Sequence, residues 1–268
     1  MIDTHTHLDQ IPSDDHARIL ERAAAAGVER IVSVGMDPTT SEAAVALANR
    51  DSRVYAAVGI HPWHAAEHSS TNAVASLEQL TRDRRVVAIG EIGLDYEGNI
   101  FTGDSYRGDA ARTVQREVLR RQLRLAGARN LPVIVHARGG AHQDVGVMLA
   151  EAGLEARAVI QLLSGTNEED IHAYVSQGCY LSVGGVATDP RETALRHAIR
   201  AIPLDRLVLE TDAPYVAPVW KGGSPSEPAD LLSIASYVAA LIDRPFTDLV
   251  AAATANACTF YRLSDTSH

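Results

Sequence analysis

The chain contains very little cysteine and almost no lysine. Cys179 and Cys258 are the two cysteines among 268 residues, and they form no Cys-x-x-Cys pattern. This argues against a disulfide framework or a cysteine zinc site and fits a reducing compartment. Lys221 is the one lysine among 24 basic residues. Together with the abundant alanine, the preference for arginine over lysine is consistent with an effect of genome base composition, so we infer no function from it.

Long apolar runs and a surplus of positive charge are missing as well. No run approaches the roughly 18 apolar residues of a membrane span, and no secretory signal is recognisable. We therefore expect a cytoplasmic protein with no membrane partner. The formal net charge is −10, whereas a protein that coats nucleic acid would be basic, so a polyanion would have to bind locally or through metal ions. Nothing in the sequence indicates an oligomeric state.

The sequence does contain a regular alternation of short apolar runs and amphipathic helical stretches. The runs are rich in Val, Ile and Leu, as is typical of parallel strands buried on both faces. Eight such units match one (β/α)8 TIM barrel of the α/β class, and we expect a single domain over residues 1–268. An open doubly wound sheet is the alternative. The expected strands cover residues 2–5, 30–35, 54–60, 86–91, 132–136, 157–161, 179–183 and 206–211.

Two histidines at the start of the chain form a possible metal-binding pair. If Ile2 to His7 is a strand, Asp3, His5 and His7 lie on one face of it. Two imidazoles about 6–7 Å apart along a strand can hold one metal ion. The chain has 11 histidines, so the pair needs further ligands from other strands before it indicates a metal site.

Imidazoles and carboxylates also follow several later strands. In a barrel of this kind the catalytic groups collect where the strands end. Each residue alone has an ordinary explanation, such as a helix N-cap for Asp212 or a satisfied core histidine for His136. Their coincidence at one rim instead predicts a hydrolytic centre with zinc, manganese or magnesium. The residues are His5, His7, His61, His64, Glu91, His136, Glu210 and Asp212.

Six short strings contain these residues and their neighbours. They are Asp3-Thr-His5-Thr-His7-Leu8-Asp9, Gly59-Ile-His61-Pro62, Gly90-Glu91-Ile-Gly93-Leu-Asp95-Tyr96, Pro132-Val-Ile-Val-His136-Ala-Arg138, Ser164-Gly165 and Glu210-Thr-Asp212-Ala-Pro214-Tyr215. The strings resemble those of the TatD family of metal-dependent deoxyribonucleases, which have amidohydrolase-like barrels. The resemblance covers nearly the whole chain, and the third string is its most specific part.

The resemblance implies a site for two divalent ions, Mg²⁺, Mn²⁺ or Zn²⁺. Glu91 would bridge the ions, and Asp212 would also act as the general base. A second-site ligand of the family is a histidine at the end of the sixth strand, where this chain has Gln161. The implied ligands are His5, His7, Glu91 and Asp212 for the first ion, and Glu91, His136 and Gln161 for the second.

Gln161 makes the second ion site unusual. An amide oxygen is a poorer ligand than imidazole for zinc-like ions, although a hard ion such as Mg²⁺ accepts it. Leu163 likewise replaces a phenylalanine of the family pattern. We expect the second site to be weak, or to fill only when substrate phosphate is present.

The resemblance also implies a DNA substrate, cleaved at phosphodiester bonds from single-stranded ends. Asp212 and Glu91 are the expected catalytic residues. A guanidinium can grip a phosphate through two parallel hydrogen bonds, and aromatic rings can stack on bases. The expected substrate-binding residues are His61, His64, Arg138, Tyr96 and Tyr215.

Two other classes of function stay open. One is an amidohydrolase-type enzyme for another small ester, lactone or amide. The intact Gly90–Tyr96 string argues against it, and so does the lack of a lysine suited to bridging two ions as a carbamate, since Lys221 follows the last strand. The other is a non-enzymatic scaffold, against which five intact ligands argue.

A stripe of arginines lies on one expected helix. Arg112, Arg116, Arg120 and Arg124 recur every four residues and could attract a nucleic-acid backbone. We expect instead a solvated outer face paired with acidic neighbours. Only Arg107 and Arg112 would lie near enough to the rim to contact substrate.

Overall fold

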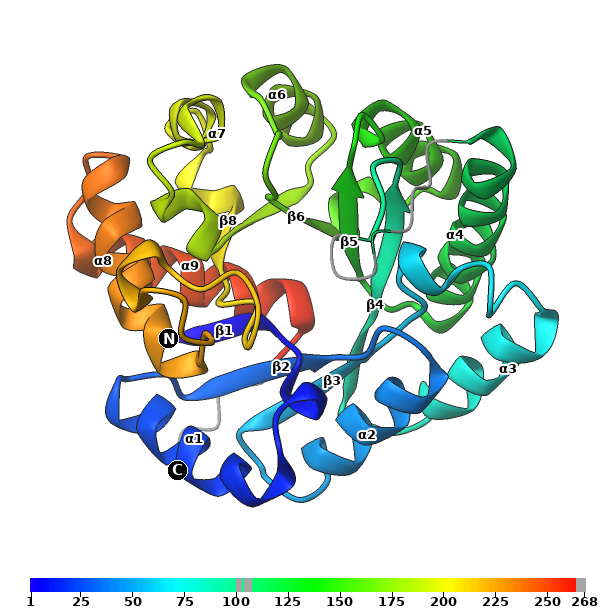
Figure 1. Ribbon diagram of the computed structural model, residues 1–268, viewed down its shortest axis with the longest axis horizontal. Coiled ribbons are helices and arrows are strands. Elements are labelled where there is room, and N and C mark those ends of the chain that lie inside the picture. Colours follow the sequence, from blue (N-terminus) through cyan, green and yellow to red (C-terminus); the bar gives the residue numbers. More distant parts are fainter. Residues whose placement is uncertain (100–102, 104–107, 264–268) are drawn as a thin grey trace.

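The eight expected strands form one parallel sheet that curls into a nearly closed barrel in the computed structural model (Figure 1). The structure describes residues 1–99, 103 and 108–263. Strands follow one another in the sheet in the order of the sequence. This confirms the (β/α)8 fold and rules out the open sheet. The strands are β1 (Ile2–Thr6), β2 (Arg30–Val34), β3 (Val54–Val58), β4 (Val86–Asp95), β5 (Val133–Arg138), β6 (Ala158–Gln161), β7 (Tyr180–Val183) and β8 (Leu207–Leu209).

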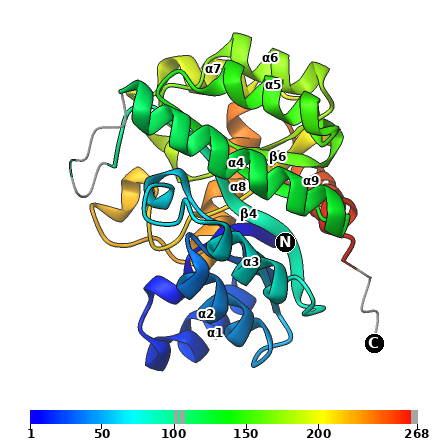
Figure 2. The same cartoon turned by 90° about the vertical axis from the view of Figure 1, so that its right-hand side faces the viewer.

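Helices return the chain over the outside of the barrel. Figure 2 shows α4 running across one side of the molecule, with α1 to α3 on one side of it and α5 to α7 on the other. No helix among the described residues is long and apolar enough to cross a membrane. The helices are α1 (His16–Ala25), α2 (Pro38–Ala48), α3 (Thr71–Leu80), α4 (Asp109–Arg129), α5 (His142–Ala152), α6 (Glu168–Ser176), α7 (Thr193–Ile199), α8 (Leu231–Leu241) and α9 (Phe246–Tyr261).

The arginine stripe lies on α4, where Arg120 and Arg124 are exposed and Arg112 packs over the ring of Tyr96 at 4.5 Å. Arg116 pairs with Asp144 at 3.2 Å, and Arg120 pairs with Glu117 at 3.2 Å. These partly exposed pairs are consistent with the expected solvated face rather than with a nucleic-acid track. Arg107 lies outside the described residues.

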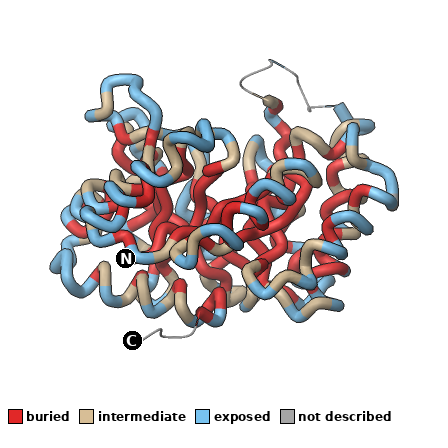
Figure 3. The backbone as a smooth tube through the Cα atoms, turned by 90° about the horizontal axis from the view of Figure 1, so that it is seen from below, coloured by how far each residue is buried: buried red, intermediate tan, exposed pale blue. Residues whose placement is uncertain are grey.

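The barrel core holds the strand ends rigidly. All ten residues of β4 are buried, and buried residues follow the strands through the middle of the molecule in Figure 3. Ile89, Ile92 and Leu94 are completely or almost completely inaccessible. Burying each such side chain contributes about 1.5–3 kcal/mol. A frame of this kind can hold catalytic side chains in one arrangement.

The barrel closes beyond the end of β8. We expected this strand to run to residue 211, but its ladder ends at Leu209. The following segment then pairs with β1: the Asp212 N–H donates to the His5 carbonyl at 2.9 Å, and the His7 N–H donates to the Ala213 carbonyl at 2.6 Å. These two bonds bring Asp212 beside the histidine pair, although about 200 residues separate them in the chain.

Asp3 stabilises the same closure. One of its carboxylate oxygens accepts from the Thr211 N–H at 3.0 Å, and the other accepts from the Thr211 hydroxyl at 2.6 Å. Burial, in the first place, raises the pKa of Asp3 to about 7. Its position on the β1 face suggested an imidazole partner, but it binds the chain after β8 instead.

Candidate metal centre

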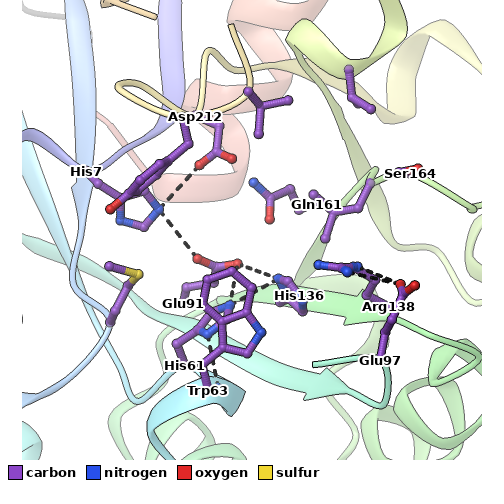
Figure 4. Close-up of a pocket in the computed structure, with 15 residues that line it drawn as sticks. His7, His61, Trp63, Glu91, Glu97, His136, Arg138, Gln161, Ser164 and Asp212 are labelled. Atoms are coloured by element: carbon purple, nitrogen blue, oxygen red, sulfur yellow. Dashed lines mark hydrogen bonds and ion pairs between the residues drawn. The ribbon is translucent and has the colours of Figure 1, made fainter. Parts of the chain in front are cut away.

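A cavity of about 360 Å³ opens where the strands end. Figure 4 shows it between the segments that carry His7 and Asp212 on one side and Arg138 on the other. Its walls include the apolar side chains of Met36, Leu163, Val186 and Val216. The polar groups of its floor are those expected from the sequence: His7, His61, Glu91, His136, Gln161 and Asp212.

Four ligand atoms converge on one side of the cavity. The two Nε2 atoms of His5 and His7 are 3.1 Å apart. Asp212 Oδ1 lies 3.7 and 3.3 Å from them, and Glu91 Oε2 lies 3.4 and 3.6 Å from them. A tetrahedral ion with bonds of about 2.0–2.1 Å separates its ligands by roughly 3.3–3.4 Å. These four atoms, the first ligand group, therefore have the spacing of a zinc-like site.

The protonation of His7 suits this role. Its Nδ1 lies 2.9 Å from the Val34 carbonyl, which can only accept, so Nδ1 carries the proton. Nε2 then offers its lone pair to the cavity. On His5, Nδ1 is buried and lies 3.9 Å from Glu210.

A second set of atoms lies across Glu91. Glu91 Oε1 is 3.0 Å from His136 Nδ1 and 3.6 Å from His61 Nε2, and the two ring nitrogens are 3.1 Å apart. We call these three atoms the second ligand group. Because Glu91 turns one oxygen to each group, its carboxylate lies between them.

Gln161 points into the cavity between Asp212 and His136 (Figure 4). Its side chain is buried, and its Nε2 makes no hydrogen bond of good geometry within the described part of the chain. The amide is nevertheless near enough to Glu210 to favour the charged form of that carboxyl. Burial outweighs this and raises the pKa of Glu210 to about 7. Gln161, at the position where the family resemblance implies a histidine, thus presents a neutral amide to the cavity floor.

The two groups are strongly coupled electrostatically. Burial disfavours charged imidazoles, but the surrounding carboxylates outweigh it and raise the pKa of His5 to about 10 and that of His136 to about 9. Burial also disfavours the Glu91 carboxylate, yet the imidazoles hold its pKa well below the usual range. In the metal-free protein these histidines hold protons that a bound ion would displace.

Three of the expected substrate-binding residues, His61, Arg138 and Tyr215, line the cavity. Arg138 is on its wall, but its Nε and a terminal nitrogen are each 3.0 Å from Glu97 Oε2. The guanidinium is therefore already paired. Tyr215 also lines the cavity, and its ring meets that of His7 edge-on at 5.5 Å.

The other two, Tyr96 and His64, are not among the residues lining this cavity. Tyr96 is buried, and its hydroxyl is paired with Asp144 and Arg116. We expected it on a loop, but β4 extends to Asp95, so Tyr96 packs at the strand end and is not available for stacking. His64 faces Glu67 at 3.8 Å.

Two contributors were not predicted, Asp95 and Trp63. Asp95 Oδ2 accepts from the Trp63 indole N–H at 2.8 Å and from His136 Nε2 at 3.1 Å. Asp95 lies in the most specific string, but its contact with His136 depends on the register of β4 on β5, which pairs Asp95 with Arg138. No local pattern in the sequence contains that register.

A parallel barrel that brings four histidines, a glutamate and an aspartate together at its strand ends defines a metal-dependent hydrolase. Sequence comparison then gives the family. The family model described as TatD related DNase matches residues 2–262, and the chain belongs to this family.

Individual relatives agree with this family. The chain is 34% identical over 265 residues to an uncharacterized metal-dependent hydrolase, YabD, of Bacillus subtilis, covering 98% of this chain and 100% of YabD. It is 34% identical over 254 residues to the 3'-5' ssDNA/RNA exonuclease TatD of Cronobacter turicensis, covering 92% of each. The crystal structure of the TatD homologue YjjV from Escherichia coli superposes with a TM-score of 0.88, at 32% identity and 98% coverage of both chains.

Proposed function

We propose that this enzyme hydrolyses phosphodiester bonds of DNA, working as an exonuclease on single-stranded ends in the cytoplasm. The observation that carries the proposal is the position of Glu91, whose two carboxylate oxygens face two separate sets of ligand atoms. Paired ion sites that share a carboxylate suit in-line displacement at phosphorus. The exonuclease named among the relatives adds support.

Each of the site residues has its own proposed role. His5, His7 and Asp212 would hold the first ion with Glu91, and Glu91 and His136 would hold the second, with Gln161 as a weak ligand. Bound divalent ions lower the pKa of water and polarise a phosphoryl oxygen. Asp212, at the cavity surface, would take the proton of the attacking water.

The cavity walls carry little positive charge, and this favours the binding of a chain end over that of a long duplex. Among the described lining residues Arg138 is the one arginine or lysine, and it is paired with Glu97. A phosphate that enters would compete with Glu97 for this guanidinium. His61 on the floor and Tyr215 on the wall would contact the terminal nucleotide.

A second candidate is the hydrolysis of a small ester, lactone or amide. It is favoured by the apolar wall of Met36, Leu163, Val186 and Val216 and by the lack of an unpaired basic side chain among the lining residues. An uncharged substrate would need no further cation.

The two candidates separate in one assay. Purified protein is incubated with Mg²⁺ or Mn²⁺ and end-labelled single-stranded DNA, with Asp212→Asn as the control. Metal-dependent shortening of the labelled strand, absent in the control, supports the nuclease. Hydrolysis restricted to a panel of lactones, esters and amides supports the alternative. Activity on neither substrate class would contradict both.

A further inference from the structure

Trp63 has two N–H groups that act on the two histidines of the second ligand group. Its backbone N–H donates to His61 Nδ1 at 3.2 Å. Its indole N–H donates to Asp95 Oδ2 at 2.8 Å, and the same oxygen accepts from His136 Nε2 at 3.1 Å. One residue therefore contacts His61 directly and His136 through a carboxylate.

The contact with Asp95 makes His136 a ligand. Asp95 is completely buried and accepts hydrogen bonds, so the proton of a neutral His136 ring lies on Nε2. In the metal-free protein Nδ1 donates its proton to Glu91 Oε1 at 3.0 Å, and a bound ion that displaces this proton would take up the Nδ1 lone pair. His136 can thus bind an ion through Nδ1.

The contact with the backbone N–H has the opposite result for His61. A backbone amide can only donate, so His61 Nδ1 must accept, and the proton of the neutral ring lies on Nε2. Nε2 faces the second ligand group and carries hydrogen instead of a free lone pair. Its distances of 3.1 and 3.6 Å to His136 and Glu91 resemble those of a ligand set, but its protonation is that of a donor.

The local chain geometry supports this arrangement. His61 precedes the short 3-10 helix Pro62–His64, as its N-cap. Pro62 has no N–H, so the first free amide of this turn belongs to Trp63.

We infer that Trp63 is a positioning residue that gives the two histidines opposite roles: His136 binds the second ion, and His61 donates a hydrogen bond to a substrate oxygen. The inference rests on the proposed hydrolysis at this cavity. It also agrees with the expected weak binding of the second ion, since only Glu91, His136 and the amide of Gln161 would remain to bind it.

The direct test is the position of the ring protons. The full chain is labelled with ¹⁵N-histidine, and long-range ¹H–¹⁵N spectra are recorded without metal and with Zn²⁺ alone. We expect His61 to carry its proton on Nε2 in both states, while His136 loses the Nδ1 proton when Zn²⁺ binds. A His61 ring protonated on Nδ1 and bound to Zn²⁺ through Nε2 would overturn the inference.

Matched variants of His61 test the same point by binding. Gln retains an N–H donor near the position of Nε2, whereas Leu does not. We expect His61→Gln and His61→Leu to bind Zn²⁺ with the native stoichiometry and affinity. In the Mg²⁺-loaded protein, dAMP should bind about tenfold more weakly to His61→Leu and within about twofold of native to His61→Gln. A weaker second ion in both variants would make His61 a ligand and refute the inference.

Trp63→Phe tests the positioning step, because it keeps the backbone N–H and removes the indole N–H. We expect the His61 proton to stay on Nε2 while affinity for the second ion falls about tenfold. Unchanged affinity in a folded variant would refute the role assigned to the indole. None of these readouts uses DNA cleavage, so a protein that passes them and fails to cut DNA contradicts only the proposed function.

Discussion

The two ligand groups differ in what fixes their histidines. In the first group the partners are backbone atoms: the Val34 carbonyl orients His7, and the Asp212 N–H binds the His5 carbonyl. In the second group His61 accepts from the Trp63 backbone N–H, but the orienting partner of His136 is a side chain, Asp95. A backbone partner persists when its side chain is replaced, whereas a side-chain partner such as Asp95 can be lost through a single substitution.

This difference indicates which ligand group is more easily altered by single substitutions. Barrel closure brings His5, His7 and Asp212 together, and Glu91 supplies the fourth ligand atom of the first group. The second group combines Glu91 of β4 and His136 of β5 with His61, which follows β3, and β6 contributes Gln161 where the family resemblance implies a histidine. We therefore expect a tightly held first ion and a weakly held second ion.

The largest effect should come from the residue shared by both groups. Glu91→Gln removes one carboxylate charge from between them, so affinity for both ions should fall by more than about 100-fold, beyond the usual cost of changing an outer partner. DNA cleavage should disappear with the ions. Metal titration checks this, with Glu67→Gln as control, since Glu67 is exposed and faces His64 at 3.8 Å, outside both ligand groups. Loss of a single ion would show that Glu91 does not bridge.

Asp212→Asn should affect only the first ligand group. We expect hydrolysis to fall about 10²–10⁴-fold, the usual contribution of a general base, with the fold retained because the bond to His5 uses the Asp212 backbone. Steady-state rates and circular dichroism measure the two effects. Asp205→Asn, at an exposed position, is the matched control. A variant that keeps more than a tenth of the native rate would exclude Asp212 as the base.

Removing the ions should lower thermal stability. Binding at 100 times the dissociation constant stabilises the folded chain by about 2.7 kcal/mol. For a domain of this size, each kcal/mol shifts the melting temperature by roughly 2–4 °C, so a chelator should lower it by about 5–10 °C. Calorimetry with and without chelator tests this. In Glu91→Gln the chelator should have little effect, and an equal drop there would mean that the stabilising ion binds elsewhere.

The smallest and most selective change is expected at Gln161. Gln161→His replaces the amide with an imidazole next to the second group, so the second ion should bind about tenfold more tightly while the first is unchanged. Gln161→Leu, with no ligand atom, is the comparison. Unchanged affinity and stoichiometry in the histidine variant would remove Gln161 from the second site.

The fold could be predicted because apolar runs and helical stretches alternate so regularly. Element ends were less predictable. The apolar pattern by itself places the start of the second helix at residue 41, but α2 begins at Pro38, since Asp37 caps it by accepting from the Thr40 N–H at 2.8 Å. The Asp-Pro pair is a known start signal that the apolar pattern alone does not include.

The first ligand group was also largely predictable, because His5 and His7 share a strand face and β8 must return beside β1. The second was less so. The predicted end of β4 was residue 91, but the strand continues to Asp95, which moved Tyr96 into the core and Asp95 against His136. The proton positions on His61 and His136 depend on Trp63 and Asp95 in three dimensions, beyond any spacing in the sequence.

The most direct test of the two-group account is a calorimetric titration of metal-free protein with Zn²⁺, followed by the same titration in the presence of dAMP. We predict one tight ion and a second that binds at least tenfold more weakly, and we predict that dAMP tightens the second alone. Two ions of equal affinity in the free protein would contradict the account.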